Sequence, residues 1–420
     1  MEPYGFPVSM RAYQRIAREG IVFRRAFSAS PTCSPSRAAL LTGQAPHSAG
    51  MLGLAHRGFS LTEPSQHLAA YLGQHGYQTV LAGHQHLTTA DPRTLGYDVV
   101  SETTEIPGDR VAAHAVEFLA NRSHQSEPFF LDVGFSEAHR PFREAASGAD
   151  RWISVLPGLP DMEEVRRDTA GFHASLEALD RAVGSVLDAL EDADLVDTTI
   201  VIVTTDHGPP FPKYKATLTD GGLGVGLILR LPGIIGSGIV SDGLVSQIDL
   251  YPTICRLVGI PAPEWIQGQS LVPSLQGAQN PVRSVVFGEV TFHAAYEPQR
   301  SIRTERWLYI RRFGDRTKPV LPNIDQSPAL DWLMEHEWHN RRLPSIQLYD
   351  NAIDPNQDVN IAGSTATRGI EQALEDRLVA WMRATGDPLL DGPVPLPPGA
   401  RVSLASDRNP DGPLVTENYQ

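Results

Sequence analysis

The residues with the clearest chemical meaning lie near the start of the chain, where Cys33 and Arg37 stand in the sequence S-P-T-C-S-P-S-R. Ser34 is typical of a helix N-cap, Pro35 suits the first helical position, and Gly43 is typical of a helix end. Cys33 is therefore expected just before a helix N-terminus, where free N–H groups and the helix dipole favour an anion. Arg37 adds a planar cation one turn further on. The segment predicts a site for a tetrahedral dianion.

Three later segments place chemically useful side chains directly after apolar runs. These side chains are His84 and His86, His139, and the pair Asp206 and His207. In open α/β sheets, ligands bind beyond the carboxyl ends of the strands, so we expect these residues to converge. Each also has a structural alternative, because a single histidine in a loop or an Asp-His-Gly turn is common without any catalytic role.

The elements that must position these residues follow an alternating pattern. Buried strands are predicted at Thr79 to Ala82, Phe129 to Phe135 and Thr199 to Thr205, and amphipathic helices at Arg110 to Asn121 and Val165 to Asp192. Such alternation predicts an α/β fold with a doubly wound, mostly parallel sheet and helices on both faces.

The pattern changes after about Gly277. Short apolar runs at Ser284 to Phe287 and Trp307 to Arg312 precede a helical stretch from Gly369 to Ala384. We therefore expect an α/β catalytic domain over 1–277, a smaller α+β subdomain over 278–390, and an irregular surface tail over 391–420, where Pro, Gly and polar residues dominate.

Charge and hydropathy exclude several classes of protein. The 49 acidic and 35 basic residues give a formal net charge of -14, so nucleic acid is not an expected partner and an anionic ligand must rely on local cations. No apolar run reaches the roughly 18 residues of a membrane span, and the first residues lack a signal-peptide layout. The sequence as given predicts a cytoplasmic protein with no membrane partner.

The motif around Cys33 resembles a known signature. Cys33-Ser-Pro-Ser-Arg37 followed by Leu41-Thr-Gly43 is similar to the signature of type I sulfatases, formylglycine-dependent hydrolases of the alkaline-phosphatase-like superfamily. The resemblance implies that Cys33 is oxidised to formylglycine by a sulfatase-maturing enzyme, such as a formylglycine-generating enzyme. Its hydrated aldehyde would supply the nucleophile. Cys255, inside a helical pattern, is interpreted as a buried structural thiol.

Further matches occur in the order of the family. Gly83-His-Gln-His-Leu87 is similar to the sulfatase Gly-Lys-x-His-Leu loop, with His84 at the usual lysine position and His86 at the family histidine. His139 matches a further active-site histidine. The resemblance implies that Asp206 and His207 bind a divalent metal. The carboxylate oxygen of Asp206 suits both Ca²⁺ and Mg²⁺, and Ca²⁺ is the expected ion.

The segment after the metal motif indicates a branch of the family. Pro209 to Lys215 resembles the heparan N-sulfatase branch, which implies that Lys215 holds the substrate sulfate, with Lys213 as a weaker candidate. The expected substrate is a sulfated small molecule or sugar, cleaved at a sulfate ester or sulfamate. The general acid would be His139 or His86.

One family element does not match. Sulfatases begin with a strand ending in paired metal-binding aspartates, whereas the first aspartate of this sequence is Asp91. We therefore expect weak metal binding by the chain as given, and an in-frame strand encoded upstream of Met1. Two alternatives to an active sulfatase stay open: a phosphonate or phosphate ester hydrolase of the same fold, and a non-catalytic binding module.

Overall fold

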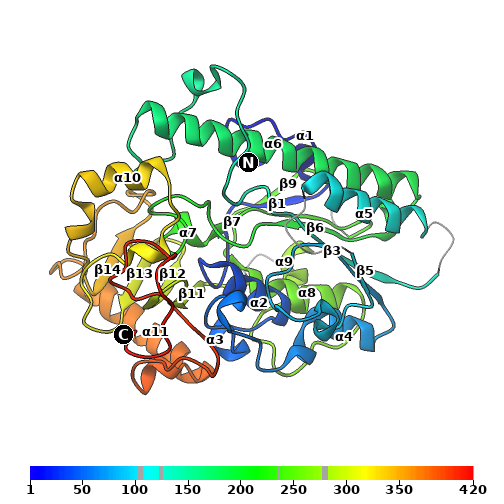
Figure 1. The fold of residues 1–420 in the computed structure, drawn as a ribbon. Coiled ribbons are helices and arrows are strands. Elements are labelled where there is room, and N and C mark those ends of the chain that lie inside the picture. Colours follow the sequence, from blue (N-terminus) through cyan, green and yellow to red (C-terminus); the bar gives the residue numbers. More distant parts are fainter. Residues whose placement is uncertain (102–106, 123–125, 235, 277–281, 420) are drawn as a thin grey trace.

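The computed structural model describes residues 1–101, 107–122, 126–234, 236–276 and 282–419. Its first part combines strands and helices in layers, and its second part is built on an antiparallel sheet (Figure 1). The expected α/β fold class with an additional C-terminal subdomain is therefore confirmed. The predicted domain boundary at 277/278 lies outside the described residues.

The first part contains short sheets rather than one continuous sheet. The parallel sheet β4-β3-β5 and the mixed sheets β6-β8-β1-β9 and β10-β2-β7 have these strands: β1 Ile21–Phe23, β2 Ala26–Phe27, β3 Gln78–Gly83, β4 Val99–Val100, β5 Phe129–Gly134, β6 Val201–Thr204, β7 Gly224–Val225, β8 Leu227–Arg230, β9 Ile239–Ser241 and β10 Val245–Ser246. β8 runs antiparallel to both β1 and β6. Apolar runs do not encode strand direction, so the sequence could not reveal this reversal.

In the part of the chain that the structure describes, no strand pairing joins the sheet β4-β3-β5 to the sheet β6-β8-β1-β9. Among the described residues, β5 pairs only with β3 and β6 pairs only with β8. Apolar side chains of both strands, including Leu131, Val133, Val201 and Val203, are only half-buried and line the same cavity. The described residues contain no strand that ends in paired aspartates, as the sequence indicated.

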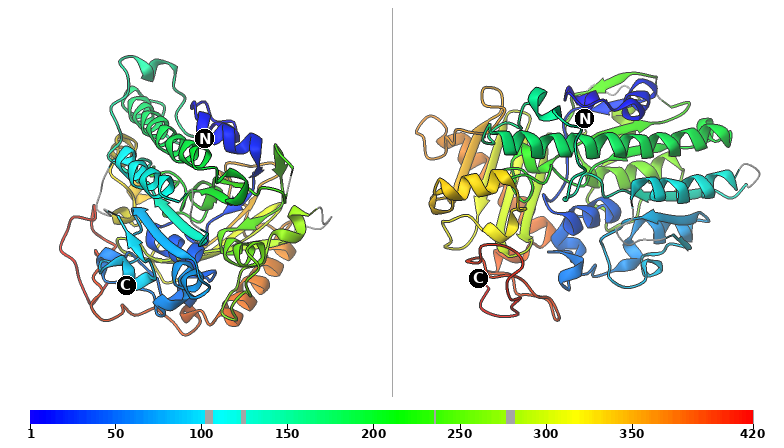
Figure 2. Two further views of the ribbon diagram at one scale, coloured as in Figure 1. Left: turned by 90° about the vertical axis from the view of Figure 1, so that its right-hand side faces the viewer. Right: turned by 45° about the horizontal axis from the view of Figure 1, so that its top comes forward.

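Helices cover both faces of these sheets. On one face lie α1 Arg11–Glu19, α5 Gly108–Ala120 and the long α6 Glu163–Asp192, with α5 packed along α6 (Figure 2). The other face carries α2 Cys33–Thr42, α3 Pro46–Ala49, α4 Leu68–Gln74, α8 Leu250–Leu257 and α9 Val272–Leu275. No described helix has both the length and the apolar content needed to cross a membrane.

The second part is an antiparallel sheet with two helices. Its strands are β11 Val285–Phe292, β12 Tyr296–Thr304, β13 Trp307–Arg312 and β14 Ile346–Asp350, in that order across the sheet. Its helices are α10 Pro328–Glu335 and α11 Arg368–Thr385, while α7 Asp220–Leu223 lies at the junction with the first part.

The C-terminal segment is irregular but is not a surface tail. Val394, Ala400, Val402 and Tyr419 are buried in a hydrophobic cluster shared by the two parts. The prediction from composition was wrong on this point, because scattered apolar residues without periodicity can still fill gaps in a core.

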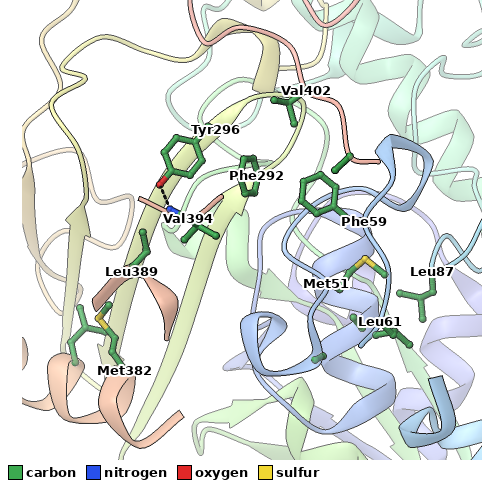
Figure 3. Packing of buried hydrophobic residues seen from close by; sticks show 14 of the residues in the cluster. Met51, Phe59, Leu61, Leu87, Phe292, Tyr296, Met382, Leu389, Val394 and Val402 are labelled. Carbon is green, nitrogen blue, oxygen red and sulfur yellow. Dashed lines mark hydrogen bonds between the residues drawn. The ribbon is translucent and has the colours of Figure 1, made fainter. Parts of the chain in front are cut away.

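This shared cluster joins segments that are far apart in the sequence. Met51, Phe59 and Leu87 of the first part meet Phe292 of the second, and Val394 donates its backbone N–H to the hydroxyl of Tyr296 over 3.0 Å (Figure 3). Leu87 directly follows His86 and Phe292 directly precedes His293. The cluster therefore anchors two segments that reach the candidate site.

Replacing Phe292 by alanine is expected to lower the free energy of unfolding by about 3 to 5 kcal/mol, because the ring is fully buried and its loss leaves a cavity. Chemical denaturation of the full chain measures the change. Leu390→Ala is the matched control, since Leu390 is 42% exposed and its truncation should stay within about 0.5 kcal/mol. A loss below about 1 kcal/mol for Phe292→Ala would contradict this packing argument.

Candidate active site

The structure brings all of the predicted site residues to one cavity of about 2020 Å³, which both parts of the chain line. The predicted residues among its lining side chains are Cys33, Arg37, His84, His86, His139, Asp206, His207 and Lys215. They come from loops and helix ends that follow β2, β3, β5 and β6. The expectation that these segments converge agrees with this arrangement.

Cys33 is the first residue of α2, whose N-cap is Thr32. The helix thus begins earlier than Ser34 suggested, because the Ser34 hydroxyl bonds the carbonyl oxygen of His86 over 2.6 Å instead of capping the helix. This bond ties the helix start to the loop that carries His86. Ser36 donates to the carbonyl oxygen of Asp206, so α2 also holds the second motif.

Two motifs meet directly at the Cys33 side chain. The Cys33 sulfur lies 3.2 Å from Nε2 of His207, whose Nδ1 faces the Gly208 carbonyl oxygen at 2.7 Å. Arg37 Nε donates to Oδ2 of Asp206 over 3.1 Å. The cation predicted for anion binding is therefore partly neutralised by the carboxylate predicted for metal binding.

The charges around Cys33 favour an anion at this position. Burial by itself would raise the pKa of the Cys33 thiol, but Lys215, His207 and a hydrogen bond from His293 hold that pKa well below its usual value. Burial would lower the pKa of His207, yet Asp206 and Cys33 raise it to about 9. Cys255 shows the contrast, since burial in α8 raises the pKa of its thiol to about 11.

The loop after β3 holds three imidazoles together. His86 has a left-handed backbone with φ of 58°, a costly conformation for a residue with a side chain. Its Nε2 lies 3.0 Å from Nδ1 of His56, and the two rings stack. Burial, with Arg37 next in importance, lowers the pKa of His84 to about 4, so His84 supplies no positive charge near neutral pH.

Lys215 is the buried cation of the site, with 5% exposure. Its Nζ lies 3.2 Å from Oδ1 of Asp325, and its backbone N–H donates to Pro209. Burial would lower its pKa, but the negative charges of Cys33 and Asp325 raise it. Lys215 therefore remains charged at neutral pH.

His139 lies at the exposed rim of the cavity. Its Nδ1 faces the carbonyl oxygen of Arg140 at 2.7 Å. Arg140 makes a two-pronged ion pair with Asp168 of α6 and donates to the Pro210 carbonyl oxygen over 2.9 Å. Arg140 thus fixes the loop of His139 against the segment that leads to Lys215.

Three residues near the site were not predicted from the sequence. They are His56, His293 and Asp325, and none belongs to a motif or follows a strand of the first part. His293 and Asp325 come from the C-terminal subdomain, where only short apolar runs and one helical stretch could be predicted. His56 and His293 could have been noted as candidates from their residue type alone. Their spacing from the motifs, however, does not distinguish them from the other histidines of the chain.

The described residues do not fit a calcium ion. The ligand atoms of Cys33, Asp206 and His207 lie within 4.8 Å of one another. Asp206 is engaged by Arg37, however, and both ring nitrogens of His207 already have partners. Calcium takes about six to eight oxygen ligands, and only one carboxylate of this group is present.

Family models match most of the chain. Residues 1–260 match the model described as Sulfatase, and residues 214–330 match the model of the C-terminal region of N-sulphoglucosamine sulphohydrolase. The chain is 28% identical to N-sulphoglucosamine sulphohydrolase of Homo sapiens, over 90% of this chain and 86% of that protein. It is also 28% identical to an ulvan-active sulfatase of Formosa agariphila, over 92% of this chain and 77% of that protein.

Solved structures share the fold. A 2-O GAG sulfatase superposes with a TM-score of 0.73 and 22% identity, covering 95% of this chain and 92% of that chain. A protein solved with its substrate D-glucosamine-2-N,6-O-disulfate superposes with a TM-score of 0.72 and 19% identity, covering 94% and 96%. These likenesses extend through both parts of the present structure.

Proposed function

The chain belongs to the sulfatase family of sulfate ester and sulfamate hydrolases, and we propose that it acts through a formylglycine made from Cys33. The observation that carries this proposal is the surroundings of Cys33. Its side chain lies at a helix N-terminus, 3.2 Å from His207, in a cavity that Arg37 and Lys215 also line. A hydrated aldehyde at this position would supply the nucleophilic oxygen.

The roles of the other residues follow from charge and exposure. Lys215 and Arg37 hold the sulfuryl oxygens, since both are cations in the cavity wall. His139 protonates the leaving oxygen or nitrogen, because its exposed position at the rim allows it to reach the part of the substrate outside the cavity. His86, held by Ser34 and His56, orients the sulfuryl group.

We further propose a sulfated sugar as substrate, with an N-sulfated glucosamine as the first choice. Support comes from the human relative, whose name specifies N-sulphoglucosamine, and from the similar structure that holds a glucosamine disulfate. The net charge of -14 does not oppose this choice, because the cations of the cavity act locally.

One observation favours a second candidate function. The incomplete set of calcium ligands around Asp206 suits a non-catalytic protein that binds sulfated sugars without cleaving them. Such a protein would use the same anion site. The two functions differ in turnover but not in the expected ligand.

Turnover of N-sulfoglucosamine by the full chain is the deciding experiment. The chain is co-expressed with a formylglycine-generating enzyme and assayed for sulfate release with and without added calcium. Phosphate release from N-phosphorylated glucosamine is measured as the control. We expect release from the sulfamate only after co-expression. Saturable binding of the sugar without any release, in protein shown by mass spectrometry to be fully modified, would support the binding protein instead.

A further inference from the structure

A second histidine lies beside His86 in the cavity, and it comes from a different loop. His56 belongs to the short 3-10 helix Ala55–Arg57, 30 residues before His86, and both side chains line the cavity. Nδ1 of His56 lies 3.0 Å from Nε2 of His86, and the two rings are parallel within 5° with centroids 5.3 Å apart. The centroids are much farther apart than the nitrogens, so both nitrogens lie between the rings. The contact therefore has the geometry of a direct N–H···N hydrogen bond along the ring planes.

The relative position of the two histidines is set by the start of α2. The hydroxyl of Ser34, which follows Cys33, accepts the backbone N–H of Ala55 over 3.1 Å and donates to the carbonyl oxygen of His86 over 2.6 Å. Ser34 is fully buried, so this hydroxyl is shielded from water. One side chain thus joins both segments that carry the histidines, and the pair is not a chance contact of two mobile side chains.

The loop of His86 is also fixed by its own neighbours. The side-chain oxygen of Gln85 accepts the backbone N–H groups of Leu87 and Thr88, and its amide donates to the carbonyl oxygen of Thr88 over 2.7 Å. These bonds enclose His86, whose left-handed backbone with φ of 58° is costly and persists only where the surroundings hold it. The loop therefore presents the His86 ring at a defined position in the cavity.

The hydrogen bond between the two rings decides which nitrogen of His86 remains for a ligand. Nε2 of His86 is engaged by His56, and the described residues offer Nδ1 of His86 no hydrogen-bond partner. A neutral imidazole carries a proton on one nitrogen only. If Nδ1 is to donate to a sulfuryl oxygen, Nε2 must accept, and its partner must be a donor. The tautomer of His86 therefore depends on the proton of His56.

His56 suits the role of this donor. Partial burial, with a smaller contribution from His86, lowers the pKa of His56 to about 4. The His56 ring is thus neutral at pH 7 and can hold its single proton on Nδ1. His84 does not compete for this role, because its ring centroid lies 5.2 Å from that of His86 at an interplanar angle of 47°, and no hydrogen bond joins these two rings in the described residues.

We propose that His56 fixes the tautomer of His86 and is thereby a positioning residue for the sulfuryl group. Its Nδ1–H donates to Nε2 of His86, so that a neutral His86 carries its ring proton on Nδ1 and donates from there to a sulfuryl oxygen. This inference rests on the proposed function, in which His86 orients the sulfuryl group. Without His56, the proton of His86 can occupy either nitrogen and the ring can turn, so the donor is no longer held towards the anion.

The tautomer is tested directly by NMR spectroscopy of the full chain labelled with ¹⁵N-histidine, after co-expression with the formylglycine-generating enzyme. A His86→Gln variant assigns the ring signals of His86. Spectra are recorded at pH 8, above the ordinary imidazole pKa of about 6.5. We expect Nε2 of His86 to show the chemical shift of an unprotonated nitrogen and Nδ1 that of a protonated one. In His56→Phe, which keeps a flat ring but has no donor, both nitrogens should show intermediate shifts.

Anion binding is measured by calorimetric titration of inorganic sulfate into the same proteins. His56→Phe should bind sulfate about 10-fold more weakly than the wild type, because the hydrogen bond from His86 to the anion is no longer held. His56→Asn is the matched variant, since its amide can donate from nearly the position of Nδ1, and its affinity should stay within about 3-fold of the wild type. His75→Phe is the control with unchanged affinity, because His75 is exposed and lies outside the residues that line the cavity.

The outcomes separate this inference from the proposed function. A protonated Nε2 on His86 in the wild type, or equal sulfate affinity of the wild type and His56→Phe, overturns the inference. Equal weakening in His56→Asn and His56→Phe also overturns it, because a donor at residue 56 would then have no effect. A wild type that shows the expected tautomer and affinities without any turnover contradicts the proposed function alone, whereas a wild type that does not bind sulfate contradicts both. His56→Leu replaces His56→Phe if thermal melting shows that the phenyl ring unfolds the protein.

Discussion

Cys33→Ala is expected to abolish hydrolysis while the protein stays folded. The side chain lies at the first position of α2, where it fills little volume and caps no backbone group. His207 and Lys215 lose an anionic neighbour, but Asp206 and Asp325 remain beside them. The free energy of unfolding should therefore fall by less than about 2 kcal/mol. Catalysis should be lost because the neighbouring hydroxyls of Ser34 and Ser36 already donate to the carbonyl oxygens of His86 and Asp206.

Cys33→Ser is the matched variant, since it keeps the shape of the side chain but cannot be oxidised to the aldehyde by the same chemistry. Both variants are compared with the wild type after co-expression with the maturing enzyme. Mass spectrometry of the peptide spanning residue 33 should show conversion of the thiol to an aldehyde in the wild type alone. Full activity of a wild-type protein whose Cys33 is still a thiol would contradict the assignment.

The positions of motifs at the ends of strands could be predicted, because a buried strand and the polar residues that follow it are recognised within one short stretch of sequence. An apolar run followed by Asp206 and His207 predicts a buried strand with polar side chains at its carboxyl end, and β6 ends two residues before Asp206. The same reasoning placed His86 and His139 after β3 and β5. Convergence then follows from the parallel arrangement of β3 and β5.

Contacts between distant segments were not predictable from the sequence. Asp325 pairs with Lys215 from a loop 110 residues away, and Glu289 of β11 donates its backbone N–H to Ala29, four residues before Cys33. Hydrophobic periodicity in the sequence does not predict such contacts. The subdomain packs on the first part through a cluster around Phe292 and Val402, whose apolar residues follow no regular spacing. The start of α2 was misplaced for a related reason, since Ser34 bonds His86 rather than its own helix.

Lys215→Ala is expected to weaken inhibition by sulfate at least 10-fold. The buried ammonium of Lys215 does not pair with Asp206, the predicted metal ligand, whereas the guanidinium of Arg37 does. Arg37 already pairs with Asp206 at 3.1 Å, whereas Lys215 faces the anionic position of Cys33 as well as Asp325. A charge-assisted hydrogen bond contributes about 1.5 to 3 kcal/mol, which corresponds to roughly one to two powers of ten in affinity.

Removing Lys215 also leaves Asp325 without its ion-pair partner, so stability and anion binding must be separated. Asp325 is only partly buried, and we expect the unfolding free energy to fall by about 1 to 3 kcal/mol in Lys215→Ala. The double variant Lys215→Met with Asp325→Asn removes both charges and should recover much of this stability while sulfate inhibition stays weak. Lys213→Ala, two residues away in the same loop, is the matched single control. Sulfate should inhibit this variant as strongly as it inhibits the wild type. If sulfate inhibition is unchanged in Lys215→Ala but weakened in Lys213→Ala, then Lys213 holds the sulfuryl group and the assignment of Lys215 is wrong.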